Sequence, residues 1–349
     1  MKKINVAING CGRIGRAFLK LAVKNPKISI VAVNDLTSSE NIAYLLKYDT
    51  AYGASGLEIK TESALAEAGT ETQGVLVVEG HKIAYFSQKD PALLPWGKLG
   101  VDVVIESTGL FASYEKSRAH IVAGAKKVLI TAPVKDEPKS KEEAMVLTGV
   151  NEDALKEAVI VSNASCTTNA ASPIMAILSE AIGIEKAMLN TVHAYTASQS
   201  LVDGPNKKDW REGRAGAQNI VPSSTGAAIA VTKVFPELQG KFDGISMRVP
   251  VVVGSIVDIT FLAKRETSAE EINGILEKAS KDKKWHGVFD VTREQLTSRD
   301  IIGNPHASIA DLSFTRVVDG NMAKVLAWYD NEMGYTNTLI EQVLKMGIN

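Results

Sequence analysis

A short apolar segment, a glycine-rich turn and a helical pattern open the chain, and this order constrains the fold more than any other feature. Residues 4–9 are predicted to form a strand, and Gly10, Gly12 and Gly15 follow in the spacing G-x-G-x-x-G before a helix. The glycines permit a tight turn and close approach of a pyrophosphate, which the helix N-terminus then binds. The pattern favours a dinucleotide-binding α/β domain.

A carboxylate stands where such a domain needs one. Residues 28–34 are predicted to form the next strand, and Asp35 follows it, 20 residues after Gly15. This spacing is expected for a partner of the adenosine ribose hydroxyls of NAD. The alternative is a glycine-rich turn in an α/β domain that binds nothing.

Composition excludes several classes of function. The 349 residues carry a formal net charge of −1, with 45% hydrophobic and 23% charged residues. This balance gives no reason to expect nucleic acid or an anionic membrane as a primary partner. No transmembrane segment, signal peptide or metal site is predicted. With Cys11 and Cys166 as the only cysteines, a structural disulfide is not expected, and a cytoplasmic location is.

The two halves of the chain differ in pattern. Strands are predicted at 101–105, 127–131 and 158–162, with a hairpin over 75–85, which favours a doubly wound, mostly parallel sheet. The second half is predicted to be an α+β domain with an antiparallel sheet. Its expected strands and helices are 188–195, 244–249, 255–262, 308–318 and 322–329, and 268–280 and 337–347.

A cysteine in a polar motif is the candidate nucleophile. Cys166 lies in Ser-Asn-Ala-Ser-Cys-Thr-Thr-Asn, residues 162–169, between a predicted strand and a predicted helix. Near exposed N–H groups and the positive end of a helix dipole, its pKa is expected to fall. A packing role is the alternative. His193, 27 residues later, is the candidate base.

Six motifs occur in order over nearly the whole chain, and their combination resembles the phosphorylating glyceraldehyde-3-phosphate dehydrogenases. They occupy residues 9–16, 162–169, 193–196, 224–228, 247–250 and 328–335. The resemblance implies a homotetramer with an NAD-binding Rossmann domain over 1–164, completed by a C-terminal helix at about 332–349. It implies a catalytic domain over 165–331.

The resemblance also implies the reaction and the site. Cys166 would attack glyceraldehyde 3-phosphate, hydride would pass to NAD, and inorganic phosphate would release the thioester as 1,3-bisphosphoglycerate. Ser165, Thr167, Thr225 and Gly226 match the inorganic phosphate site, and Thr196 and Arg248 match the substrate phosphate site. The residues that match the cofactor site, beyond the glycines and Asp35, are Arg13, Ile14, Lys89, Thr131, Asn331 and Tyr335.

The chain departs from the family at several places. Cys11 replaces a phenylalanine, Ala170 a second cysteine, Lys89 an arginine, and residues 251–254 a more polar loop. Two alternatives stay open. An erythrose-4-phosphate dehydrogenase would share the cysteine, histidine and turn but release a free acid. A dinucleotide-binding module would lack catalysis.

Overall fold

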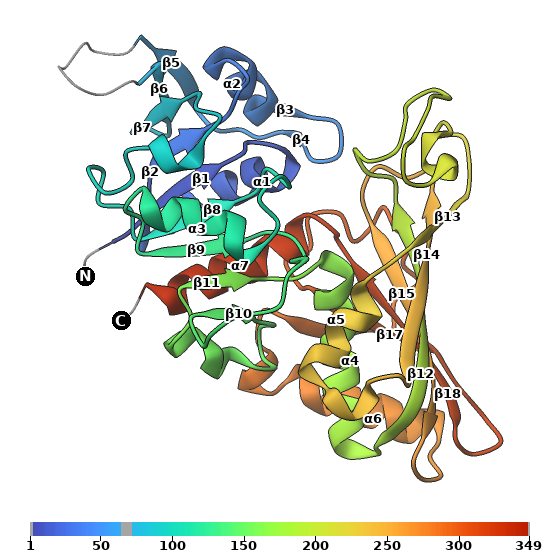
Figure 1. Ribbon diagram of the computed structural model, residues 1–349. Helices are drawn as coiled ribbons and strands as arrows, with labels where there is room; N and C mark the ends of the chain where they lie inside the picture. Colours follow the sequence, from blue (N-terminus) through green and yellow to red (C-terminus); the bar gives the residue numbers. More distant parts are fainter. Residues whose placement is uncertain (1–2, 64–71, 348–349) are drawn as a thin grey trace. The chain divides into compact units, whose positions relative to one another are not determined.

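The chain forms two compact units. The computed structural model describes residues 3–63 and 72–347. Unit 1 comprises residues 1–146, 152–164 and 338–349, and unit 2 comprises residues 147–151 and 165–337 (Figure 1). The C-terminal helix α7 (Met333–Met346) therefore contributes its first residues to unit 2 and the remainder to unit 1.

Unit 1 contains a nine-stranded sheet. In order across the sheet the strands are β10 (Glu143–Met145), β11 (Ile160–Ser162), β9 (Lys127–Ile130), β8 (Val103–Glu106), β1 (Ile4–Asn9), β2 (Ile28–Asn34), β7 (His81–Phe86), β6 (Gly74–Val78) and β5 (Ile59–Glu62). All neighbours from β10 to β7 pair in parallel, and β6 and β5 pair antiparallel at one edge. The predicted doubly wound, mostly parallel sheet is confirmed.

Helices connect these strands because parallel neighbours require a crossover. Helix α1 (Arg13–Ala22) packs on β1 and β2, α2 (Ser39–Lys47) on β5 and β6, and α3 (Tyr114–Val122) on β9 and β11. The predicted hairpin is confirmed, since Glu79 and Gly80 turn with positive φ between β6 and β7. The short elements are β3 (Tyr48–Asp49), β4 (Gly53–Ala54), η1 (Pro91–Leu93) and η2 (Glu152–Lys156).

Unit 2 contains a seven-stranded sheet. The strands in order are β13 (Val221–Ser224), β14 (Phe242–Val249), β12 (Ile184–Ala194), β15 (Ser255–Ala263), β18 (Met322–Tyr329), β17 (Ser308–Val318) and β16 (Phe289–Thr292). Four of the neighbouring pairs are antiparallel, as expected, whereas β12 with β14 and β16 with β17 run parallel. Parallel pairing is possible because long connections separate the partners in sequence; one of them contains helix α5 (Ala227–Val234).

Three helices bury one face of this sheet. Helix α4 (Cys166–Ala181) contacts β12, β15, β17 and β18, α5 contacts β14, and α6 (Ala269–Ser280) contacts β16 and β17 (Figure 1). The alternating burial along β15 is typical of a sheet with one face in the core. Single-turn 3₁₀ segments complete the unit: η3 (Trp210–Gly213), η4 (Pro236–Leu238) and η5 (Lys283–Trp285).

The glycine turn is sterically demanding at two of its three glycines. Gly10 has a φ of +93°, and a Cβ there would lie 2.8 Å from the backbone nitrogen of Thr108. A Cβ on Gly15 would lie 2.1 Å from the carbonyl oxygen of Gly10, whereas a Cβ on Gly12 would meet nothing within 4 Å. Gly15 is therefore required by packing, and Gly12 leaves space beside the helix N-terminus.

We predict that Gly15→Ala lowers the melting temperature of the ligand-free protein by a few degrees, since overpacking costs about 1–3 kcal/mol. Gly12→Ala is the matched control and should leave the melting temperature unchanged, because its site is open and its φ is −66°. Differential scanning calorimetry of both variants makes the comparison. Equal melting temperatures for the two variants would contradict the packing described for Gly15.

Candidate active site

The local structure around Cys166 is that of a capped helix start. Strand β11 ends at Ser162, Ala164 takes a left-handed φ of +53°, and α4 begins at Cys166. Ser165 is the N-cap, and its Oγ accepts a hydrogen bond of 3.0 Å from the backbone N–H of Thr168. The predicted strand-to-helix turn is confirmed, and it places the thiol in the first turn of a helix.

His193 lies beside this thiol with a defined tautomer. The Nε2 atom of His193 lies 3.4 Å from the Sγ atom of Cys166. The Nδ1 atom lies 2.6 Å from the carbonyl oxygen of Ala194, which can only accept a hydrogen bond. Nδ1 of the neutral ring therefore carries the proton, and the Nε2 lone pair faces the thiol. This arrangement can take a proton from sulfur.

Arg248 is brought to the same place by strand pairing. Strands β12 and β14 run parallel, with His193 opposite Arg248 in the register. The Nε atom of Arg248 is shielded from solvent and has no hydrogen-bond partner within the described residues. A guanidinium with free donors is suited to an anionic ligand.

Tyr329 is a member of this site that the sequence did not reveal. Its hydroxyl lies 3.0 Å from Thr167 Oγ1 and 2.7 Å from Thr191 Oγ1, and its ring packs edge-on against the His193 ring at 5.9 Å. Tyr329 thus ties the start of α4 to β12, the two elements that carry thiol and imidazole. Its place at the end of β18 was the available signal, but aromatic residues in strands are more often core residues.

The other predicted phosphate-binding residues lie at the ends of elements of unit 2. Thr196 follows β12, and its hydroxyl lies 3.0 Å from Ser198 Oγ. Thr225 and Gly226 precede α5, where Thr225 Oγ1 accepts from the backbone N–H of Ala227 at 3.2 Å. The Thr167 hydroxyl lies 3.0 Å from the Tyr329 hydroxyl.

The predicted cofactor residues are divided between the units. Asn331 and Tyr335 belong to unit 2 and are buried there. Asn331 Oδ1 accepts from the Gly254 N–H at 3.0 Å and from Ser255 Oγ at 3.2 Å, so its Nδ2 is the atom suited to donate to a ligand.

In unit 1 the predicted cofactor residues follow neighbouring strands. The glycine turn follows β1, Asp35 follows β2, Lys89 follows β7 and Thr131 follows β9, all at the carboxyl ends of parallel strands. Ligands of doubly wound sheets bind along this edge. Lys89 is exposed and Thr131 half-buried.

Contacts within the turn fit a dinucleotide. The Asp35 carboxylate accepts from the Cys11 N–H at 2.7 Å and from the Thr37 N–H at 2.9 Å, which fixes its position after β2. Helix α1 begins after Gly12 with no side-chain cap, so its first N–H groups face the open space beside that glycine. These are the donors that a pyrophosphate requires. Ile14 lies in this first turn.

The Arg13 side chain is engaged elsewhere. Its guanidinium makes two hydrogen bonds to Asp49, at 2.9 and 3.2 Å, and lies over the Tyr52 ring. Its backbone is therefore the part that belongs to the turn. Burial, with Asp35 nearby, raises the pKa of the Cys11 thiol to about 12, so this second cysteine is not a ready nucleophile.

Two domain families of known proteins match this chain, one in its first part and one in its second. Residues 4–114 match the domain family "Glyceraldehyde 3-phosphate dehydrogenase, NAD binding domain", and residues 165–331 match the corresponding "C-terminal domain". The chain belongs to the glyceraldehyde-3-phosphate dehydrogenase family. Its NAD-binding domain agrees with the predicted cofactor.

Relatives from distant organisms align with nearly the entire chain. Glyceraldehyde-3-phosphate dehydrogenase 1 of Kluyveromyces lactis is 47% identical over 341 residues, which cover 97% of this chain and 98% of that protein. Glyceraldehyde-3-phosphate dehydrogenase 1 of Trichormus variabilis is 45% identical over 99% of this chain and 97% of its own length. Glyceraldehyde-3-phosphate dehydrogenase of Borreliella burgdorferi is 45% identical, with 98% and 99% covered.

Neither a membrane span nor a metal cluster was found in the part of the chain that the structure describes. No helix there is long and apolar enough to cross a bilayer. No group of histidine, cysteine, aspartate and glutamate side chains in residues 3–63 and 72–347 is arranged to hold a metal ion.

The expectation of a lowered thiol pKa is wrong for this dehydrogenase chain without ligands. Burial raises the pKa of Cys166 above its ordinary value, and Arg248 and the hydrogen bonds of the first helical turn lower it by less. Burial, with Arg248, lowers the pKa of His193 to about 3, against the raising effect of the Ala194 carbonyl. At Cys166, desolvation therefore outweighs the effect of the helix terminus.

We predict that Arg248→Leu slows alkylation of Cys166 by iodoacetamide at pH 7.5 by about threefold or more. The Arg248 cation favours the thiolate, so its removal raises the thiol pKa, and each unit lowers the thiolate fraction tenfold below the pKa. The pH dependence of the alkylation rate should shift to higher pH in Arg248→Leu and stay near wild type in Arg248→Lys. A Leu variant with an unshifted profile would exclude this influence.

Proposed function

We propose that this chain is an NAD-dependent phosphorylating dehydrogenase that converts D-glyceraldehyde 3-phosphate to 1,3-bisphosphoglycerate in glycolysis and gluconeogenesis. The observation that supports this most is the 3.4 Å approach of Cys166 Sγ to a His193 Nε2 whose lone pair is turned towards it. Membership of the glyceraldehyde-3-phosphate dehydrogenase family agrees with this reaction.

Cys166 and His193 carry the covalent chemistry of the proposal. Sγ attacks the aldehyde carbon as its proton passes to His193 Nε2, and His193 returns that proton to the oxygen that was the carbonyl, which gives a thiohemiacetal with Nε2 again unprotonated. NAD, when bound, supplies the acceptor for the hydride that leaves the thiohemiacetal carbon. His193 accepts the hydroxyl proton of that adduct, which leaves a thioester on Cys166. Inorganic phosphate then attacks the thioester carbonyl, the C–S bond breaks, and the acyl phosphate departs.

Arg248 and the neighbouring loops are proposed to hold the two phosphates. Arg248 and Thr196 would bind the substrate phosphate, and Ser165, Thr167, Thr225 and Gly226 the attacking phosphate. The unpartnered Nε of Arg248 and the N–H groups that begin α4 and α5 supply donors of the required kind.

We further propose that the chain works as a homotetramer in the cytoplasm. The support in the structure is a set of large apolar side chains that unit 2 exposes between β12 and β14. Trp210 is 84% exposed, and Leu201, Val202 and Ile220 are also largely exposed. Apolar side chains gathered in one segment are typical of a surface that pairs with another copy.

We predict that the purified protein forms acyl phosphate, trapped as a hydroxamate, only when glyceraldehyde 3-phosphate, inorganic phosphate and NAD are all present. Cys166→Ser should keep below about one hundredth of this activity while binding NAD as tightly as wild type, because a hydroxyl is a far weaker nucleophile at neutral pH. NADP should be a poorer cofactor, since Asp35 repels its 2′-phosphate. Free acid as the main product would favour the erythrose-4-phosphate alternative.

We predict that analytical ultracentrifugation of the purified protein gives a molar mass four times that of the 37.4 kDa chain. Trp210→Glu should shift the distribution to smaller species, because it puts a charge into the apolar contact. Val122→Glu is the matched control, since Val122 is 75% exposed on α3 and belongs to unit 1, not to the apolar segment of unit 2. A monomeric wild-type protein, or equal shifts in both variants, would refute the assembly.

A further inference from the structure

Three adjacent parallel strands of unit 1 end in buried polar residues, directly before the turns at the cofactor edge. Asn34, Asn9 and Glu106 lie side by side on β2, β1 and β8, because Asn9 pairs with Asn34 on one side and with Glu106 on the other. Each is at most 4% exposed. Central strands of a parallel sheet are normally apolar, and buried polar groups are costly unless they are hydrogen-bonded.

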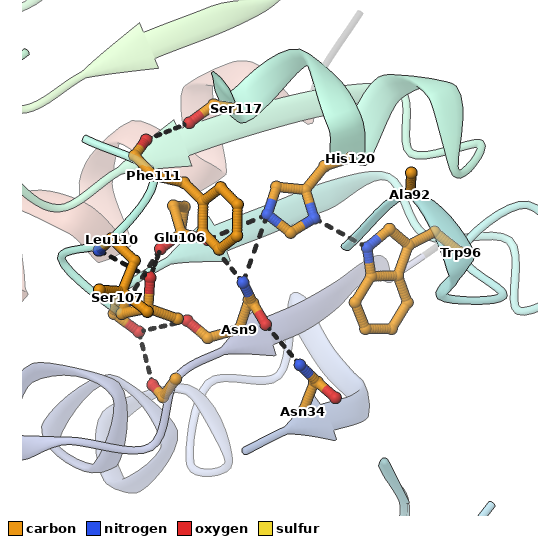
Figure 2. A network of polar contacts seen from close by, with 12 residues as sticks. Asn9, Asn34, Ala92, Trp96, Glu106, Ser107, Leu110, Phe111, Ser117 and His120 are labelled. Carbon is orange, nitrogen blue, oxygen red and sulfur yellow. Dashed lines mark hydrogen bonds and ion pairs between the residues drawn. The ribbon is translucent and has the colours of Figure 1, made fainter. Parts of the chain in front are cut away.

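These residues belong to one continuous network, shown in Figure 2. Asn34 Nδ2 donates to Asn9 Oδ1 at 2.7 Å, and Asn9 Nδ2 donates to Glu106 Oε2 at 2.6 Å. His120 of α3 reaches the same Oε2 through Nε2 at 3.0 Å, and its Nδ1 lies 3.0 Å from Trp96 Nε1. His120 and Trp96 are fully buried.

The direction of the bond between His120 and Glu106 is fixed by Trp96. The indole N–H of Trp96 can only donate, so His120 Nδ1 must accept and its Nε2 must carry the proton. His120 therefore donates to Glu106. Glu106 Oε1 accepts in addition from the backbone N–H of Thr108 at 2.9 Å and from the Thr108 hydroxyl. Four donors thus converge on one buried carboxylate.

The two residues that follow Glu106 contact the glycine turn. The Thr108 backbone nitrogen lies 2.8 Å from the position that a Cβ on Gly10 would take. Ser107 Oγ donates to the Gly10 carbonyl oxygen at 2.6 Å. The segment that Glu106 holds is thus in direct contact with the turn at the cofactor edge.

We infer that His120 is a positioning residue for NAD affinity, which acts through Glu106 and Thr108 on the backbone of the glycine turn. This inference rests on the proposed function only in that the glycine turn binds NAD. His120 is fully buried, so its effect would be on where the turn lies. A donor at its Nε2 position orients the carboxylate, and the carboxylate fixes Thr108 against Gly10.

Calorimetric titration of the full-length protein with NAD tests the inference. We expect His120→Leu to weaken binding about tenfold, which corresponds to about 1.4 kcal/mol. His120→Gln should recover most of this loss, because its terminal amide can donate from near the Nε2 position. In steady-state kinetics the KM for NAD should rise in His120→Leu while the KM for the aldehyde stays near wild type.

Ser117→Ala is the matched control for a loss of packing. Ser117 lies on the same helix, is fully buried, and donates to the Phe111 carbonyl oxygen at 2.7 Å without touching Glu106 (Figure 2). Its Kd for NAD should stay within about twofold of wild type. If His120→Leu binds NAD as wild type does, or if both variants weaken binding equally at equal melting temperature, the inference is wrong.

A milder variant keeps the test decisive if His120→Leu does not fold. Trp96→Phe keeps the ring but removes the donor that fixes the His120 tautomer, and it should weaken NAD binding two- to threefold. An unchanged Kd in Trp96→Phe would then overturn the inference. Failure of the wild-type protein to bind NAD would instead overturn the cofactor assignment itself, and with it the role of His120.

Discussion

Parallel pairing of β1 with β2 and β8 is the constraint on which unit 1 depends. It sends every strand of the set in one direction, so the turns after Asn9, Asn34 and Glu106 all emerge at one edge. The glycine turn packs against Ser107 and Thr108, which follow the end of the neighbouring strand β8. Asp35 can accept from the Cys11 N–H because β2 ends beside β1. In unit 2 the parallel pair β12 and β14 has the same effect, since it puts His193 and Arg248 in register.

Much of this arrangement could be predicted from local sequence. The boundaries of β1 and β2 follow from apolar runs that end at Gly10 and Asp35, and the hairpin turn follows from Glu79-Gly80. The strand-to-helix turn at Cys166 follows from the apolar run before it and the helical pattern after it. In each case a few neighbouring residues contain the whole physical cause, so no knowledge of the fold is needed.

Other features could not be predicted because their cause is non-local. Alternation along β12 and β14 is compatible with either direction of pairing, so the parallel pair was missed. The pKa of Cys166 depends on burial by segments far away in sequence, which outweighs the helix terminus that the sequence displays. The role of Tyr329 depends on two threonines, one of them 162 residues away.

Two buried histidines of this chain perform opposite tasks at the same ring atom. In His193 the Nδ1–H donates to a carbonyl and Nε2 keeps its lone pair, whereas in His120 an indole N–H donates to Nδ1, so Nε2 carries the proton and is a donor. Neither neighbour can reverse its role, because a carbonyl has no proton to give and an indole N–H has no lone pair to offer. One imidazole therefore turns a lone pair towards Cys166, and the other donates a hydrogen bond to Glu106. The difference is set by the group that contacts Nδ1, which is a main-chain carbonyl for His193 and an indole N–H for His120.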